Sequence, residues 1–391
     1  MNFTDLTAFL DTMAATRTPG CTAAVYLDGK PVYKYAAGVA DLETRAPMTG
    51  DEYFNIYSCS KVTTVTAAAQ LLEKGVFLLT DPLYEYIPEY RHMAVQTPDG
   101  LTEAKNPITI GDLFSMTAGF HYNLNCNAYK KARELTGGRM DTATVARCYA
   151  SEPLGFEPGT HWRYSLCHDI LAGLVSILTG MPFRNYVQKN IFDPLDMRGC
   201  TYHADDAVKA KMAAQYRFQP PTGGTDDIVE AQKSGSGKCG QFVNVGLGVS
   251  YIVGPEYDSG GAGITTNVDD YAKLAGALAC GGIGATGERI LAADTVELMK
   301  VNRLGADQLR DMSWQPLRGY GYGLGVRTHI DQAKSGSIAR LGEFGWGGAA
   351  GATIIMDTQL RLGVFFAQHT LNPREEWYQP RLKNVVYACM R

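Results

Sequence analysis

Strand signals at both ends of the chain place the strongest constraint on how this sequence can fold. Residues 21–40 predict two strands joined by a turn at Asp28-Gly29. Near the other end, residues 319–328, 343–356 and 362–368 again predict strands, and turn signals separate them. Because short turns link the strands at both ends, we expect one antiparallel sheet that combines the N- and C-terminal segments.

Helical signals fill the part of the sequence between these strands. In Lys61–Lys74 the apolar residues fall near one helix face, and Gly75 stands where a C-terminal cap belongs. Further helices are predicted at Ile108–Met116, at Ile170–Leu178, after a capping box at Thr266–Asp269, and at Glu375–Met390. Residues 217–261 are rich in Gly, Pro, Ser and Lys and predict a long loop region.

These signals predict an α/β fold of the α+β type, with an antiparallel sheet flanked by helices and a mostly helical lobe inserted into it. Residues 1–75 and 246–391 would form the sheet lobe, and residues 76–245 the inserted helical lobe. We expect the two lobes to make one domain, with its site between them.

Composition and charge exclude several classes of function. Lys and Arg number 36 and Asp and Glu 40, so the net charge is −4, which argues against a nucleic-acid surface. No stretch approaches the roughly 18 uncharged apolar residues of a membrane helix. The first residues do not resemble an export signal, and the nine scattered cysteines include no CxxC pair. We therefore expect a cytoplasmic protein with free thiols, and neither nucleic acid nor membrane as a partner.

The sharpest chemical feature is the tetrad Ser58-Cys59-Ser60-Lys61 at the start of the first predicted helix. A serine and a lysine three positions apart lie on one helix face. The helix N-terminus favours negative charge on the serine oxygen and a neutral lysine, and a neutral lysine can take the serine proton. By itself the tetrad is weak evidence, because Ser58 could equally be an N-cap and Lys61 a solvated helix residue.

Further segments accompany this tetrad in a fixed order. They are Tyr53–Lys61, Ala68–Gly75, Leu79–Pro82, Ile108–Ile110, Thr117–Phe120, Phe156–Thr160, Tyr164–Leu166, Gly260–Ile264, Tyr320–Gly323 and Gly345–Gly348. As an ordered set, which runs from about residue 20 to residue 370, they resemble the serine β-lactamase-like and penicillin-binding-protein-like family. Within it, the chain is most similar to class C enzymes and to family VIII carboxylesterases. The resemblance implies a β-lactamase/transpeptidase-like fold.

The resemblance also implies that Tyr164 faces the pair formed by Ser58 and Lys61. A phenol has a reference pKa near 10, and a nearby lysine ammonium would lower it. We therefore expect Tyr164 to take the Ser58 proton and to return it to the leaving group. The resemblance places the oxyanion between the backbone N–H groups of Ser58 and Ala349.

The sequence departs from the β-lactamase pattern at two motifs. The usual Tyr-x-Asn is Tyr164-Ser165-Leu166 here, and Leu166 cannot donate the hydrogen bond of the asparagine amide. The usual Lys-Thr-Gly is Trp346-Gly347-Gly348, so the positive charge of the lysine is lost. Both changes match the carboxylesterase branch. Leu166, Trp346, Gly347 and Gly348 are therefore predicted to contact the substrate.

The sequence thus predicts a serine hydrolase that forms an acyl-enzyme on Ser58, most simply a carboxylesterase for small apolar esters with weak or no β-lactamase activity. A β-lactamase or D-peptide hydrolase, an acyltransferase with the same site, and a non-catalytic binding protein remain as alternatives. No cofactor is implied, and the seven histidines show no metal-ligand spacing. The expected partner is a small ester or amide, and the oligomeric state is left open.

Overall fold

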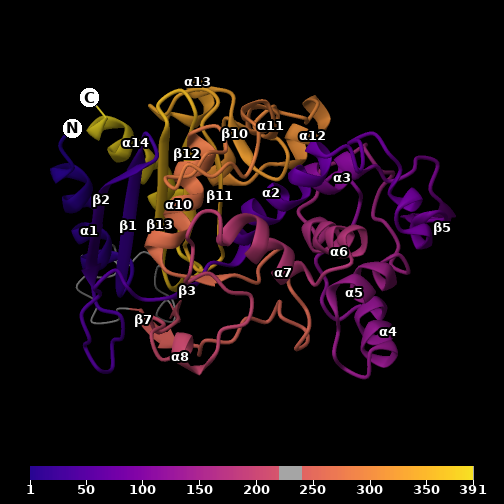
Figure 1. Ribbon diagram of the computed structural model, residues 1–391, viewed down its shortest axis with the longest axis horizontal. Coiled ribbons are helices and arrows are strands. Elements are labelled where there is room, and N and C mark those ends of the chain that lie inside the picture. Colours follow the sequence, from indigo (N-terminus) through magenta and orange to yellow (C-terminus); the bar gives the residue numbers. More distant parts are fainter. Residues whose placement is uncertain (220–239, 391) are drawn as a thin grey trace.

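A computed structural model describes residues 1–219 and 240–390, and it shows a sheet with helices on one side of the molecule and a group of helices on the other (Figure 1). The main sheet has seven strands in the order β2-β1-β13-β12-β11-β10-β9, and every neighbouring pair is antiparallel. The strands are β1 (Gly20–Leu27), β2 (Lys30–Gly38), β9 (Tyr320–Tyr322), β10 (Arg327–His329), β11 (Phe344–Gly347), β12 (Thr353–Asp357) and β13 (Leu362–Gln368).

The two ends of the chain meet in this sheet, as the sequence predicts. Strand β1 pairs with β13, so that Val25 lies opposite Val364. The predicted turn at Asp28-Gly29 is confirmed, and both residues have positive φ angles of 51° and 74°. The predicted antiparallel fold class is therefore confirmed.

Two of the predicted C-terminal strands are each a pair of strands. Residues 319–328 form the hairpin of β9 and β10, and residues 343–356 contain β11 and β12. The glycines in these segments caused the error, because they permit tight turns that the continuous apolar pattern hides. Gly325 and Gly351, with φ of 73° and 92°, lie in the two turns.

Both faces of the sheet are covered, which explains why β13 is a continuous apolar run. On one face α10 (Val268–Ala279) packs against the strands, and the ring of Tyr271 lies 4.8 Å from that of Phe365. On the other face α1 (Thr4–Thr16) and α14 (Glu375–Cys389) cover Val364 and Phe366. The alternation of side chains along β13 therefore supplies two separate cores.

Helix α2 (Ser60–Glu73) lies between the sheet and the second group of helices (Figure 1). It packs against α6 on one side and β11 on the other, and nearly all its residues are buried. That group comprises α3 (Ile110–Ser115), α4 (Asn127–Leu135), α5 (Thr142–Tyr149), α6 (Cys167–Thr179) and α7 (Phe183–Val187). The lobe boundaries at residues 75 and 246 remain a prediction, because α2 contacts both groups of elements.

Two local predictions need correction. The cap of α10 is Asn267, whose side chain accepts a hydrogen bond from the N–H of Asp270, and Thr266 belongs instead to β8 (Thr265–Thr266). Within the predicted loop 217–261, β6 (Tyr216–Gln219) pairs with β7 (Gln241–Asn244), and β6 also pairs with β14 (Thr370–Leu371). The prediction fails there because the partner strands lie far away in sequence. Residues 220–239 of this region lie outside the described part of the chain.

In the described part of the chain, no single helix has the length and hydropathy to cross a membrane. The pair Cys167–Thr179 and Phe183–Phe192 passes that test together, with a bend of 78° between its members.

Gly363 on β13 provides a test of the packing between the sheet and α10. A Cβ atom there would lie 2.4 Å from the backbone nitrogen of Gly276. Since backbone atoms cannot move aside as a side chain can, Gly363→Ala should lower the free energy of unfolding by about 1–3 kcal/mol. The measurement is chemical denaturation, with Gly248→Ala as the matched control because a Cβ at Gly248 meets nothing within 4 Å. Equal midpoints for the two variants would contradict this packing.

Candidate active site

Ser58 lies at the start of α2, in the short 3₁₀ turn Tyr57–Cys59. The strand β3 (Phe54–Asn55), paired with β8, leads into this turn. Tyr57 has a φ of 45°, in the left-handed region that non-glycine residues rarely adopt. Such strain costs on the order of 1–3 kcal/mol and is often found where a functional side chain is held in place. This turn brings Ser58 to the wall of a cavity that Tyr164 and Trp346 also line.

Lys61 is fully buried one turn further along α2. Its Nζ lies 3.2 Å from Ser58 Oγ, 3.3 Å from the hydroxyl of Tyr122 and 2.7 Å from the carbonyl oxygen of Gly261. Burial lowers the pKa of Lys61 to about 7, because the ammonium loses its hydration. A large fraction of the side chain is therefore a neutral amine near pH 7, with Ser58 Oγ within hydrogen-bond distance.

A buried carboxylate lies close enough to affect this lysine. Asp169, in the first turn of α6, raises the pKa of Lys61 and so partly opposes the effect of burial. Its Oδ1 accepts hydrogen bonds from Tyr257 and Ser259, at 2.9 and 2.7 Å. A Cβ on Gly261 would lie 2.5 Å from Asp169 Oδ2 and 3.2 Å from Lys61 Nζ, so only glycine fits between these two side chains.

Tyr164 completes the group around Ser58. Its hydroxyl lies 2.7 Å from Ser58 Oγ, and Trp346 Nε1 donates to that same hydroxyl at 3.3 Å. The Tyr164 ring is stacked between the rings of Tyr122 and Trp346, with centroids 5.5 and 5.6 Å away. These contacts fix the phenol against the serine.

The sequence-based expectation for the pKa of Tyr164 is wrong. Burial raises it well above the ordinary value, and the hydrogen bonds with Ser58 and Trp346 offset only part of this effect. The expectation assumed a lysine ammonium beside the phenol, yet burial acts on both groups and disfavours the charged form of each. Tyr164 therefore stays protonated at neutral pH, and Lys61 is the group that loses its proton.

Ala349 follows β11 and lines the same cavity as Ser58. Its N–H donates no hydrogen bond to any residue within 1–219 and 240–390. A Cβ on the preceding Gly348 would lie 2.1 Å from the carbonyl oxygen of Ile56. This close approach holds the end of β11 against the segment that leads into Ser58.

The cavity has a volume of about 210 Å³. It is lined by Ser58, Tyr164, Trp314, Pro316, Leu317, Arg327, Trp346, Gly347, Ala349, Glu375 and Gln379. The structure thus brings Trp346 and Gly347 to the cavity, whereas Leu166 is buried in the core and Gly348 packs behind the wall.

Sequence reasoning missed several residues around this cavity. Tyr122 and Asp169 touch or influence Lys61, but neither stands at a spacing that marks it in the sequence. Arg327, Glu375 and Gln379 also line the cavity without belonging to any motif. Within the described ranges, no group of three or more His, Cys, Asp or Glu side chains could hold a metal ion.

Known proteins resemble this chain in sequence and in fold. A family model described as Beta-lactamase matches residues 7–386. The esterase EstB of Burkholderia gladioli is 29% identical over 365 residues, which cover 90% of this chain and 86% of that protein. Among solved structures, the hydrolase EstCE1, described as having promiscuous acyltransferase activity, is 22% identical with a TM-score of 0.77 over 98% of this chain and 97% of that one. A family VIII carboxylesterase is 18% identical with a TM-score of 0.74, covering 99% and 97% of the two chains.

The titration of Lys61 can be followed through the reactivity of Ser58. Below pH 7 the lysine is an ammonium and cannot accept a proton, so labelling of Ser58 by a fluorophosphonate should be slow there. It should rise with pH through a midpoint of about 7. The measurement is the second-order labelling rate across the neutral pH range.

Replacing the nearby carboxylate should move this midpoint. Asp169 raises the pKa of Lys61, so Asp169→Asn is expected to shift the midpoint to lower pH. Asp28→Asn is the control, because Asp28 pairs with Arg361 at the distant turn between β1 and β2. A midpoint that moves upward, or not at all, in Asp169→Asn would show that this carboxylate does not act on Lys61.

Proposed function

This chain belongs to the beta-lactamase family, and from that premise we propose that it is a serine carboxylesterase that acts through an acyl-enzyme on Ser58. One observation supports the proposal above all others: the Ser58 hydroxyl lies between a buried amine and a phenol, 3.2 and 2.7 Å away. A nucleophile, a base of matched pKa and a proton donor are what acyl transfer requires.

In the proposed mechanism, Lys61 acts as the base for Ser58 and Tyr164 acts as the proton donor for the leaving group. Neutral Lys61 takes the Ser58 proton as Oγ attacks the ester carbonyl, and the backbone N–H groups of Ser58 and Ala349 hold the oxyanion. Each such donor contributes about 3–4 kcal/mol to transition-state stabilisation. The C–O bond to the alcohol then breaks, the Tyr164 phenol protonates the leaving oxygen, and the Lys61 ammonium returns a proton to Tyr164. Water releases the acyl group by the same steps in reverse.

Esters are favoured over β-lactams because Trp346 and Leu166 stand where the family usually carries a lysine and an asparagine. Trp346 fills the place of the lysine of the third motif, and its indole binds Tyr164. Leu166 supplies no amide where the family carries asparagine. The relative EstB is named an esterase, which agrees with this choice. A β-lactamase or D-peptide hydrolase is therefore the less favoured activity.

Acyl transfer to an alcohol or amine remains the second candidate. It uses the same acyl-enzyme, and only the acceptor differs. The similarity to EstCE1, described as a hydrolase with promiscuous acyltransferase activity, motivates this candidate. A non-catalytic binding role is least favoured, since Ser58, Lys61 and Tyr164 are all present and in contact.

The remaining parts of the proposal concern the substrate and its location. A cavity of about 210 Å³ accommodates short acyl or alcohol groups, so the proposed partner is a small ester. We also propose a cytoplasmic location, where the eight described cysteines, all free and buried, would remain reduced.

Turnover of two reporter substrates tests this function. We expect p-nitrophenyl butyrate to be hydrolysed far faster than nitrocefin, because the site lacks the family's lysine and asparagine. Ser58→Ala should abolish both reactions while leaving the melting temperature close to that of the wild type. Ester turnover that survives in Ser58→Ala would exclude the mechanism, and a preference for nitrocefin would favour a β-lactamase.

A second variant tests the proton donor. Tyr164→Phe should reduce kcat for p-nitrophenyl butyrate at least about 100-fold, as expected when a general acid–base group is lost. Tyr251→Phe is the matched control. Its ring packs against Tyr122, 5.5 Å between centroids, but its hydroxyl bonds to no group in the described residues. Near-normal rates in Tyr164→Phe would mean that Lys61 acts without the phenol.

A further inference from the structure

One end of the cavity is polar, which the apolar motifs around Trp346 did not predict. Arg327 comes from β10, and Glu375 and Gln379 come from successive turns of α14. All three line the same cavity as Ser58, while Trp314, Leu317 and Trp346 provide its apolar wall. The proposed mechanism uses none of the three polar side chains.

Two glycines on β11 allow these polar groups to reach the strand. A Cβ on Gly347 would lie 2.6 Å from Gln379 Nε2 and 3.6 Å from Glu375 Oε1. A Cβ on Gly345 would lie 3.0 Å from Arg327 Nη1. Because Gly345 and Gly347 are two positions apart, they face the same side of the sheet. The polar groups therefore gather along the strand that ends next to Ala349, close to the proposed oxyanion donors.

Arg327 has hydrogen-bond donors to spare. It is 1% exposed, and its Nη2 donates to Glu343 Oε1 at 2.8 Å, so a fully buried carboxylate balances its charge. Its Nε and Nη1 have no hydrogen-bond partner among the described residues. Buried donors without partners are costly, and such groups commonly bind a water molecule or a ligand. Since Glu343 already balances the positive charge, an uncharged acceptor suits these donors.

Glu375 offers the complementary group. It lies in the cavity wall, and no hydrogen bond joins its carboxylate to another residue in the described part of the chain. Burial raises the pKa of Glu375 to about 7, the neighbouring Glu376 adds to this effect, and Arg327 opposes it. A carboxyl group with this pKa accepts hydrogen bonds readily and is also available as a donor.

The charges around the cavity select the kind of group that fits this end. An anion bound to Arg327 would meet Glu375, and a cation bound to Glu375 would meet the guanidinium of Arg327. A neutral group that both donates and accepts hydrogen bonds satisfies both side chains at once, with Gln379 as a third partner.

We propose that Arg327, Glu375 and Gln379 form a subsite that selects esters bearing a hydroxyl or carboxamide group on the portion bound in this cavity. This inference rests on the proposed esterase function and narrows its substrate class from apolar esters to hydroxylated or amidated ones. Glu375 is the specificity-determining residue, because it accepts the hydrogen bond that a purely apolar ester cannot donate.

Two pairs of esters test the subsite, one for each portion of the substrate. The first pair compares glycerol 1-monobutyrate, which carries hydroxyls on its alcohol portion, with propyl butyrate. The second pair compares methyl 3-hydroxybutyrate, which carries a hydroxyl on its acyl portion, with methyl butyrate. In at least one pair, kcat/KM should favour the hydroxylated ester by about tenfold or more, as expected for a hydrogen bond to a charged group. The pair that shows the preference identifies the portion that occupies the cavity.

Variants of α14 link this preference to the subsite. Glu375→Leu should abolish it, and Glu375→Gln, which can still accept a hydrogen bond, should retain part of it. Arg381→Leu is the control on the same helix, because Arg381 is exposed, does not line the cavity and is not among the groups that shift the pKa of Glu375. Should Glu375→Leu fail to fold, Gln379→Leu is expected to reduce the preference in the same direction. Two results would overturn the proposal. One is a wild type that shows no preference in either pair. The other is a preference that persists in Glu375→Leu, or in Gln379→Leu if Glu375→Leu does not fold.

Binding to the inactive protein separates this proposal from the proposed function. Calorimetric titration of Ser58→Ala with the same ester pairs requires no catalysis. Tighter binding of the hydroxylated ester, without ester turnover by the wild type, would support the subsite and reject the esterase function. Turnover of esters by the wild type, together with equal binding of both members of each pair, would support the esterase function and reject the subsite.

Discussion

The burial of the Lys61 amine is the constraint on which the rest of the site depends. An ammonium in this position loses its hydration, so its pKa falls to about 7 and the side chain can act as a base beside Ser58. The same burial keeps the Tyr164 phenol protonated. In the proposed mechanism, one physical effect therefore divides the roles, with the lysine as base and the tyrosine as donor. Asp169 moderates the effect, and the Gly261 carbonyl accepts a hydrogen bond from the buried amine.

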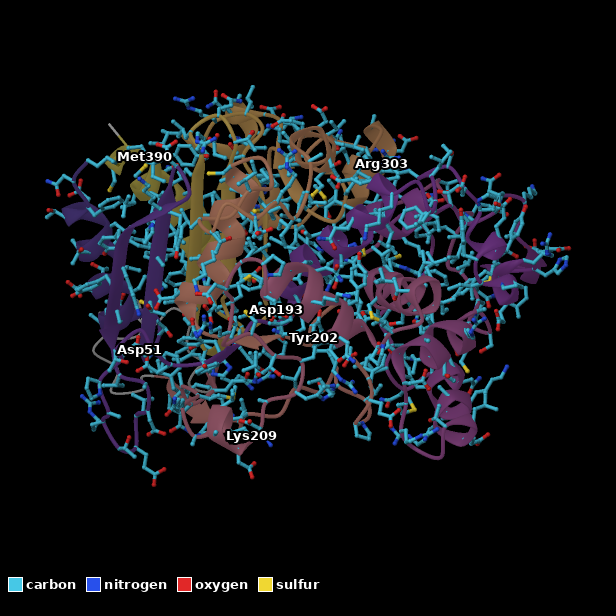
Figure 2. All side chains as sticks on the ribbon, viewed as in Figure 1. Asp51, Asp193, Tyr202, Lys209, Arg303 and Met390 are labelled. Carbon is cyan, nitrogen blue, oxygen red and sulfur yellow. The ribbon has the colours of Figure 1, made fainter. Side chains whose placement is uncertain are left out.

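The position of α2 between two groups of elements produces this burial. The helix packs on α6 and β11 at once. Tyr164 then contacts Ser58, Gly261 contacts Lys61, and Trp346 contacts Tyr164. Glycines on β11 then allow close approach, because Gly348 meets the Ile56 carbonyl and Gly347 meets Gln379. Figure 2 shows how densely side chains fill the space around these ribbons. The cavity beside Ser58 has a volume of about 210 Å³.

Prediction from sequence succeeded where a signal is local and failed where it is not. The strand Leu362–Gln368 and the helix at Glu375 were predicted because their apolar patterns are continuous or periodic over several residues. The hairpins of β9 with β10 and β11 with β12 were merged, since apolar residues continue on both sides of the glycine turns. The pKa of Tyr164 was predicted in the wrong direction, because desolvation depends on rings contributed by residues 122 and 346.

The sequence by itself determined the family, the antiparallel sheet that joins both ends of the chain, and the identity of Ser58, Lys61 and Tyr164 as candidates, because ordered motifs and hydrophobic periodicity are properties of neighbouring residues. Only the tertiary structure decided which groups are charged and what surrounds the nucleophile. Arg327, Glu375 and Gln379 reach the cavity from a strand and a helix more than 250 residues beyond Ser58. Burial and electrostatic fields are set by all the atoms nearby in space, whatever their distance along the chain.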